Sequence, residues 1–289
     1  MQTHPVEKSS VTERPSGSVV APLTYTTKKS EKLVYLITEM GEDEDSPEYH
    51  EWYDVHDMVI HDARRAVSDF SVDREGFMLC HSASRVEDFY DDTNIKAVYN
   101  EEVEKLVVAE TGASRVLVFD HTIRVGSDDL RRERQVREVV NLVHNDYTTD
   151  SGPQRVTDLL RENKIIQDIE TRFAIFNLWR SIAGPVLSSP LALLDAQSVS
   201  SRDWVPCDLD YGDRMGEIYN VAFNADHRWY YFPIMTAEEI LMFKNFDSAE
   251  DGRARFTPHT AFSDPTTPPE SPHRESIETR VLAFFTDED

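Results

Sequence analysis

The stretch Val140-Asn-Leu-Val-His144-Asn-Asp146-Tyr-Thr-Thr-Asp-Ser-Gly-Pro153 decides how this chain is interpreted. Its first four residues form a strand-like apolar run that ends at His144. The residues after Asp146 are polar and finish in a Gly-Pro pair. A strand that opens into such a loop is typical of the mouth of a β-barrel or β-sandwich, where binding residues collect. A histidine and a carboxylate two residues apart on a strand also point to the same face.

His144 and Asp146 could therefore be two ligands of a metal ion. A histidine from elsewhere in the fold, such as His259 after Pro258, would complete a set of two histidines and one carboxylate. That set holds Fe(II) and leaves further coordination positions open. The triplet alone is weak evidence, since about two H-x-[DE] triplets arise by chance in a chain with ten histidines and 54 acidic residues. The alternative is a surface turn in which Asp146 caps the next segment and His259 only packs.

Charged residues recur in the last strand-like segment. Arg274, Ser276, Glu278 and Arg280 share one parity, so an unbroken strand would place them on one face. Burying such groups unpaired is costly, and a dicarboxylate ligand would offset that cost. Guanidinium binds carboxylate bidentately, so the pattern predicts an arginine clamp for a 2-oxo acid. The alternative is that one arginine pairs with Glu278 and the face is solvated.

Composition limits the classes of partner. The formal charge of −24 argues against nucleic acid and anionic membranes, because both require a cationic surface. No apolar stretch approaches a membrane span, and the N-terminus lacks the apolar region of a signal peptide. Two cysteines, Cys80 and Cys207, do not form a disulfide or zinc pattern. We therefore expect a cytoplasmic protein with a small-molecule partner, as a monomer or homodimer.

The order of elements indicates a β-rich core with flanking helices. Residues 1–22 read as a mobile lead-in and residues 23–289 as a single domain. Helices are expected at residues 48–69, 91–111, 154–163 and 237–243, the last capped by Thr236 with Glu239. Strands are expected at residues 33–37, 77–80, 114–120, 173–179, 229–233, 253–259 and 276–285, and a turn is expected to lead into residues 191–194.

Several runs in the sequence resemble a mostly fungal family of AsaB-like and gibberellin desaturase-like hydroxylase/desaturases, which is related to a component of bacterial cephalosporin 7-methoxylase. The resemblance extends from about residue 31 to residue 286 and keeps the order of the family's motifs. The runs are Val143-His-Asn-Asp-Tyr147, Asn177-Leu-Trp-Arg180, Trp229-Tyr-Tyr-Phe-Pro233, Phe243-Lys-Asn-Phe-Asp-Ser248, Arg255-Phe-Thr-Pro-His-Thr-Ala-Phe262 and Arg274-Glu-Ser-Ile-Glu-Thr-Arg280.

The resemblance implies an Fe(II)- and 2-oxoglutarate-dependent oxygenase of secondary metabolism. It implies a double-stranded β-helix (jelly-roll, cupin-like) core with His144, Asp146 and His259 as iron ligands. O2 and 2-oxoglutarate would be consumed as hydrogen is abstracted from a small, largely apolar substrate, giving hydroxylation or desaturation. Arg274 with Ser276 fits an R-x-S cosubstrate motif, and Arg280 is the second candidate. The Pro-rich insert between His259 and Arg274 departs from the commoner pattern and leaves this register open.

The substrate pocket and two other functions complete the expectations. Tyr147, Arg180, Trp229 and Tyr231 are candidate pocket residues, because Arg180 is a charge on an apolar strand and the others are amphipathic aromatics near the motifs. One alternative function is a cupin-like metal-dependent isomerase or cyclase, which shares the ligands but not the arginine clamp. The other is a non-catalytic β-sandwich binding protein whose histidines are structural.

Overall fold

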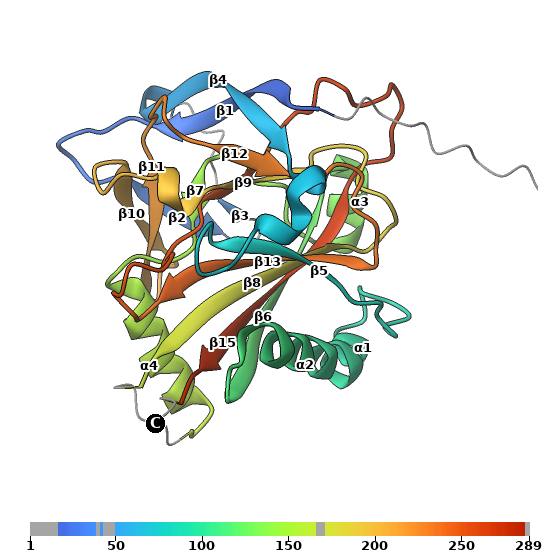
Figure 1. Cartoon of the computed structure of the whole chain (residues 1–289), viewed down its shortest axis with the longest axis vertical. Helices are drawn as coiled ribbons and strands as arrows, with labels where there is room; N and C mark the ends of the chain where they lie inside the picture. The colour runs from blue at the N-terminus through green and yellow to red at the C-terminus, as the bar shows by residue number, and fades with distance from the viewer. Residues whose placement is uncertain (1–16, 39–40, 43–49, 166–170, 287–289) are drawn as a thin grey trace, which may run out of the picture.

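Two β-sheets form the framework of the molecule, and helices lie around them (Figure 1). The structure, a computed structural model, describes residues 17–38, 41–42, 50–165 and 171–286. The ten-stranded sheet has the order β1 (Val19–Thr26), β4 (Tyr53–Asp62), β12 (Trp229–Tyr231), β9 (Leu191–Leu194), β14 (His259–Ala261), β7 (His144–Asn145), β11 (Met215–Val221), β10 (Trp204–Asp210), β2 (Val34–Thr38), β3 (Gly41–Glu42). The five-stranded sheet has the order β5 (Phe77–His81), β13 (Glu239–Asp247), β8 (Phe173–Ser181), β15 (Glu275–Phe284), β6 (Arg115–Val125).

Four α-helices are described: α1 (Asp92–Asn94), α2 (Asn100–Thr111), α3 (Asp128–Arg134) and α4 (Ser151–Glu162). Within the described ranges, no helix is long and apolar enough to cross a membrane. Helix α2 ends at Gly112, whose φ of 70° lies in the left-handed region that glycine adopts at little cost. Helices α1 and α2 lie within the expected range 91–111, and α4 covers most of the expected range 154–163, so both expected helices are confirmed.

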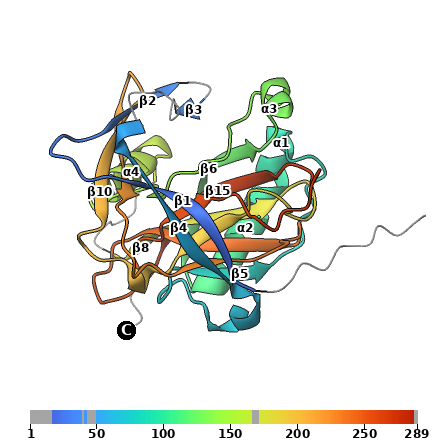
Figure 2. The ribbon, with the colours of Figure 1, turned by 90° about the horizontal axis from the view of Figure 1, so that it is seen from above.

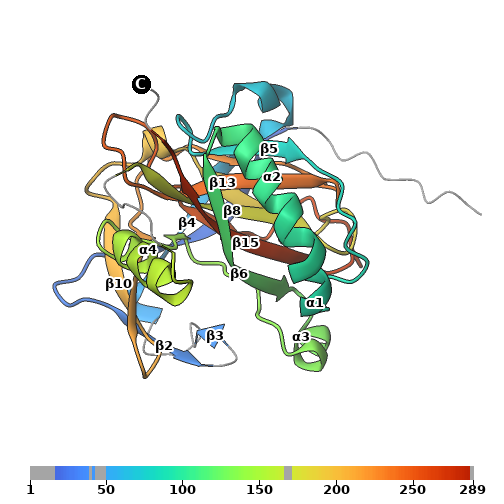
Figure 3. The same cartoon turned by 90° about the horizontal axis from the view of Figure 1, so that it is seen from below.

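The five-stranded sheet has two chemically different faces. One face of β15 carries Ile277, Val281 and Ala283, which pack in a cluster with Val103 and Val107 of α2. Figure 3 shows α2 lying across this side of the sheet. Side chains alternate along a strand, so Ser276, Glu278 and Arg280 face the other way, toward the ten-stranded sheet. A polar face is thus enclosed between the sheets.

The ten-stranded sheet curls around a core of its own. Val143 N donates to Thr24 O at 2.9 Å, so β1 lies beside the residues that immediately precede β7. The curl encloses apolar side chains that include Leu23, Ile60 and Trp229. Figure 2 shows β1 and β4 crossing over the five-stranded sheet. The opposite face of the ten-stranded sheet packs against the five-stranded sheet, which completes the predicted double-stranded β-helix core.

Two expected helices are strands in the structure. Residues 53–62 form β4, whose residues 53–60 pair with β1, and residues 48–49 lie outside the described residues. Residues 239–247 form the fully buried strand β13 between β5 and β8. Among the described residues of the first expected helix, only residues 50–52 and 63–69 are helical, as short 3-10 segments. The rest of both predictions was wrong because a short apolar run without a clear period fits a buried strand as well as a helix. The expected capping contact still forms, since Thr236 N donates to Glu239 Oε2 at 2.8 Å, but the chain continues as a strand.

The other boundaries differ less. The strand expected at residues 253–259 is shorter, because only His259–Ala261 pairs, while Pro258 and the residues before it form a connection. Strand β1 begins at Val19, within the expected lead-in of residues 1–22, while residues 1–16 lie outside the described residues. The remaining expected strands are confirmed, with shifts of a few residues at their ends.

Helix α4 packs so closely on β13 that its second residue must be small. A Cβ atom built on Gly152 would lie 2.4 Å from the ring of Phe246. We expect Gly152→Ala to lower the free energy of unfolding by about 1–3 kcal/mol through overpacking, measured by urea denaturation. The control is Gly17→Ala, because nothing lies within 4 Å of the added methyl group. Equal urea midpoints for the two variants would contradict the packing described for α4.

Candidate metal centre

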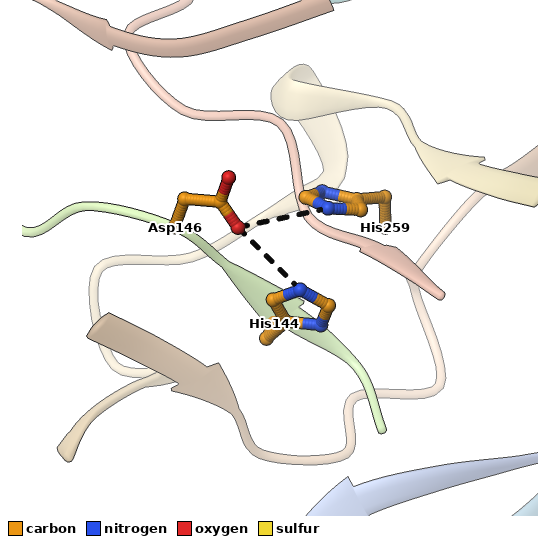
Figure 4. Close-up of side chains that lie close together, drawn as sticks. All are labelled: His144, Asp146 and His259. Atoms are coloured by element: carbon orange, nitrogen blue, oxygen red, sulfur yellow. Dashed lines mark ion pairs between the residues drawn. The ribbon is translucent and has the colours of Figure 1, made fainter. Parts of the chain in front are cut away.

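His144, Asp146 and His259 lie together on the inner face of the ten-stranded sheet (Figure 4). His144 of β7 pairs directly with His259 of β14, so neighbouring strands present the two imidazoles on one face. Asp146 Oδ1 lies 3.5 Å from His144 Nε2 and 3.9 Å from His259 Nε2. One potential ligand atom from each residue lies within 4.8 Å of the other two. The structure therefore brings together the three residues singled out in the sequence.

Backbone carbonyl groups orient both imidazoles. His144 Nδ1 lies 2.8 Å from Leu142 O, and His259 Nδ1 lies 3.1 Å from Thr257 O. A carbonyl oxygen only accepts, so each Nδ1 carries the hydrogen and each Nε2 keeps its lone pair. Histidine ligands in metal sites typically donate their second ring N–H in this way. Two lone pairs and one carboxylate oxygen thus face a common point, which fits a metal ion.

Burial keeps His259 neutral. Desolvation, followed by electrostatic repulsion from the neighbouring His144, lowers the pKa of His259 from 6.5 to about 3. The Phe243 ring packs 4.7 Å from the His259 ring, measured between centroids, and contributes to this apolar environment. A metal ion would therefore meet an imidazole at neutral pH without having to displace a proton from it.

The second oxygen of Asp146 is bound by the opposite sheet. Asn177 Nδ2 donates to Asp146 Oδ2 at 2.9 Å, and Arg280 Nε donates to the same atom at 2.8 Å. Burial would raise the pKa of Asp146, but the charge of Arg280 and the histidines outweigh it and hold the pKa well below its ordinary value. The carboxylate is consequently ionised, and its Oδ1 is directed toward the histidines.

Asn145 connects the segments that carry the histidines. Its Nδ2 donates to Tyr147 O at 2.8 Å and to Asn245 O at 2.9 Å. Its Oδ1 accepts from Thr257 N at 3.0 Å, two residues before His259. This buried amide is bonded on both its nitrogen and its oxygen, so it fixes β7 relative to the approach to β14.

Acidic groups exceed basic ones around the three residues. Arg280 forms salt bridges with Asp146, Glu278 and Asp120. Burial raises the pKa of Glu278 against the opposing charge of Arg280, and the negative charge of Asp146 adds to the increase. Arg280 is the shared partner of three carboxyl groups, and a divalent cation beside Asp146 would supply further positive charge to this cluster. The charges as well as the donor atoms therefore fit a divalent metal.

Arg274 is a buried arginine without a carboxylate partner among the described residues. Its Nη1 donates to Ser189 O at 2.7 Å, its guanidinium lies 5.4 Å from the ring of Trp179, and its Nε has no hydrogen-bond partner. Burial, and then the nearby charge of Arg124, lower the pKa of Arg274 to about 9. An anion beside it would satisfy the free donor and offset the repulsion.

Ser276 and Arg124 lie beside Arg274. Ser276 pairs with Arg124 across β15 and β6, which places both side chains on the polar inner face. The Ser276 hydroxyl donates to Arg124 O at 3.4 Å, and Arg124 Nη1 donates to Glu138 O at 2.9 Å. Ser276, Arg124 and Arg274 are therefore neighbours at one end of the inner face of the five-stranded sheet.

The expected pocket residues are distributed differently. Arg180 faces the α2 side, where it bonds Ser82 O and lies 5.5 Å from the ring of Tyr99. Trp229 and Tyr231 lie inside the curl of the ten-stranded sheet, on the opposite face from the histidines. Tyr147 follows Asp146 and packs on the α4 cluster, and burial raises the pKa of its hydroxyl. Only Tyr147 of the four adjoins the ligand cluster.

Asn177 and Arg124 were not identified from the sequence. Asn177 could have been noticed as a lone amide within the apolar run of residues 173–179. Arg124 lies beyond the expected strand of residues 114–120, and only the extension of β6 to Val125 places it opposite Ser276.

Comparisons with known proteins agree with this arrangement. Residues 23–284 match the family described as an oxidoreductase/YMDC permease-like domain. The hydroxylase/desaturase efuI of Hormonema carpetanum is 34% identical over 259 residues, which cover 82% of this chain and 86% of the relative. The Fe(II)/2-oxoglutarate-dependent dioxygenase nvfI of Aspergillus novofumigatus is 29% identical over 242 residues, which cover 79% and 83%.

The likeness extends to a solved structure. An iron and alpha-ketoglutarate-dependent endoperoxidase, NvfI, superposes with a TM-score of 0.80 at 26% sequence identity, covering 93% of this chain and 98% of that chain. These matches confirm the resemblance to fungal hydroxylase/desaturases. The relation to a cephalosporin 7-methoxylase component stays a prediction.

The neutral state of buried His259 makes stability depend on pH. Below pH 6.5 the unfolded chain binds a proton that the folded chain excludes down to about pH 3. Stability of the metal-free protein should therefore fall as the pH falls through this window, by up to about 1.4 kcal/mol per pH unit from this group. We expect a shallower dependence in His259→Gln, measured by urea unfolding in EDTA. Exposed His81→Gln is the control, and parallel curves for His259→Gln and wild type would refute the neutral assignment.

Proposed function

We propose that this chain, which belongs to the oxidoreductase/YMDC permease-like family, is an Fe(II)- and 2-oxoglutarate-dependent oxygenase whose iron ligands are His144, Asp146 and His259. The observation that carries the proposal is the convergence of His144 Nε2, His259 Nε2 and Asp146 Oδ1 on one largely enclosed point. Relatives of known cofactor requirement, such as nvfI, are Fe(II)/2-oxoglutarate-dependent dioxygenases. Bound iron supplies the activation of O2 for oxidation of a C–H bond.

Each side chain has a separate task in this proposal. His144 and His259 present their Nε2 atoms as nitrogen donors, because backbone carbonyls accept from their Nδ1–H groups. Asp146 supplies one anionic oxygen at low exposure. Arg274, supported by Ser276 and Arg124, binds the distal carboxylate of 2-oxoglutarate, since its Nε is buried without a partner. Enclosure between two sheets excludes water and strengthens these electrostatic contacts.

The substrate of the proposed enzyme is a small, largely apolar metabolite. The ligand cluster adjoins Phe243, which belongs to an apolar cluster that also contains Trp179. The chain carries a net charge of −24, which disfavours a polyanionic substrate. The relatives reported above are a hydroxylase/desaturase and a dioxygenase, so we propose hydroxylation or desaturation as the reaction.

Removal of one histidine tests the ligand set. In an anaerobic titration with Fe(II) and 2-oxoglutarate, wild type should develop the weak visible charge-transfer band of a 2-oxo acid chelated to iron. His144→Ala should lose this band, because the variant keeps two of the three ligands. His61→Ala, which removes a histidine from β4, is the control and should keep it. A band of unchanged intensity in His144→Ala would exclude His144 as a ligand.

Replacement of the buried arginine tests the cosubstrate site. Arg274→Met should raise the dissociation constant of 2-oxoglutarate about 30-fold or more, since truncating one partner of a buried charge pair costs at least about 2 kcal/mol. The constant is measured by isothermal titration with the metal-loaded protein. Arg132→Met, on exposed α3, is the control and should bind as wild type does. Equal affinity of Arg274→Met and wild type would place the cosubstrate carboxylate elsewhere.

A further inference from the structure

Arg280 and Arg274 lie on the same face of the five-stranded sheet but in opposite states. Arg280 forms hydrogen bonds from all three of its nitrogens: Nε to Asp146, Nη1 to Asp120 and Thr122, and Nη2 to Glu278. Arg274 has no carboxylate partner among the described residues. Arg280, within β15, and Arg274, just before β15, therefore cannot serve the same ligand in the same way. The guanidinium of Arg280 already binds carboxylates of the protein itself.

The contact between Arg280 and Asp146 is reinforced by the register of the sheet. Arg280 of β15 pairs directly with Asn177 of β8, so the two side chains stand next to each other on the inner face. Both donate to the same atom, Asp146 Oδ2, at 2.8 and 2.9 Å. Oδ1 of the same carboxylate receives neither bond and faces the two histidines. The two oxygens of Asp146 therefore differ in their contacts: Oδ2 accepts two hydrogen bonds, and Oδ1 faces the histidines.

We propose that Arg280 and Asn177 are positioning residues that restrict Asp146 to coordination through Oδ1 alone, and that Arg280 does not bind the cosubstrate. This inference rests on the proposed function, because it concerns the same metal. A carboxylate oxygen that accepts two directed hydrogen bonds, one of them from a cation, has little remaining capacity to approach a metal. Outer partners of this kind orient a ligand and keep it in its ionised form.

The experiment separates metal binding from cosubstrate binding. The dissociation constant of Co(II), whose absorption spectrum reports the ligands, is measured first, and that of 2-oxoglutarate is measured afterwards on the Co(II)-loaded protein. Asn177→Leu and Arg280→Lys should weaken Co(II) binding by about 10- to 100-fold and shift its visible bands. Both variants should leave the affinity of loaded protein for 2-oxoglutarate unchanged. Arg274→Met should show the reverse pattern.

Two further variants sharpen the result. Thr122→Val removes only the weak 3.4 Å contact to Arg280 Nη1 and serves as the matched control, with Co(II) affinity expected at the wild-type value. Asp146→Ala should lose Co(II) affinity and regain part of it in millimolar formate, because Asn177 and Arg280 still form a site for one carboxylate. The double variant Asp146→Ala/Asn177→Leu should regain less. Asn177→Leu changes no charge, so it decides the question even if Arg280→Lys does not fold.

Each outcome has a distinct meaning. Unchanged Co(II) affinity and spectrum in Asn177→Leu would overturn the inference and leave the proposed function standing. A loss of 2-oxoglutarate affinity in Arg280→Lys equal to that in Arg274→Met would show that Arg280 binds the cosubstrate, which also overturns it. If wild type binds neither Co(II) nor 2-oxoglutarate, the proposed function fails and the inference fails with it.

Discussion

One carboxylate joins the two sheets at the centre of the molecule. Asp146 follows a strand of the ten-stranded sheet, and its Oδ2 accepts from Asn177 and Arg280 of the five-stranded sheet. A buried carboxylate is tolerated only when it is paired and hydrogen-bonded, so the separation and register of the sheets must satisfy these contacts. The inner faces are correspondingly polar here, although Ile277 and Val281 on the reverse of the same strand are fully buried and apolar.

The same polar face divides into two regions of opposite character. Around Arg280 the carboxylates outnumber the cation, which suits a divalent metal. Around Arg274 and Arg124 the cations predominate, which suits a dianion. In the proposed enzyme, iron and 2-oxoglutarate would compensate these two regions separately. The arrangement explains why two arginines six positions apart, Arg274 just before β15 and Arg280 within it, are not redundant.

The candidate cluster could be predicted in part from the sequence, because the relevant rules are local. The spacing of His144 and Asp146 follows from the period of a strand, and the alternation of Ser276, Glu278 and Arg280 follows from the same period. The prediction of secondary structure failed for β4 and β13, because their apolar runs acquire a strand conformation from distant partner strands. Register between strands that are far apart in the chain decides which partners Arg274, Arg280 and Asn177 contact. No local sequence pattern encodes this register.

Asn145 has a consequence for how the site responds to its metal. Its amide bonds to the backbone of three segments, including Thr257 just before His259, so the spacing of the two imidazoles is set by backbone contacts that exist without any ion. A metal ion bound by these residues would therefore contribute little to ordering the chain around it. Ions of similar size would exchange at such a site without refolding of the chain, so the identity of the bound metal would depend partly on which ions are available.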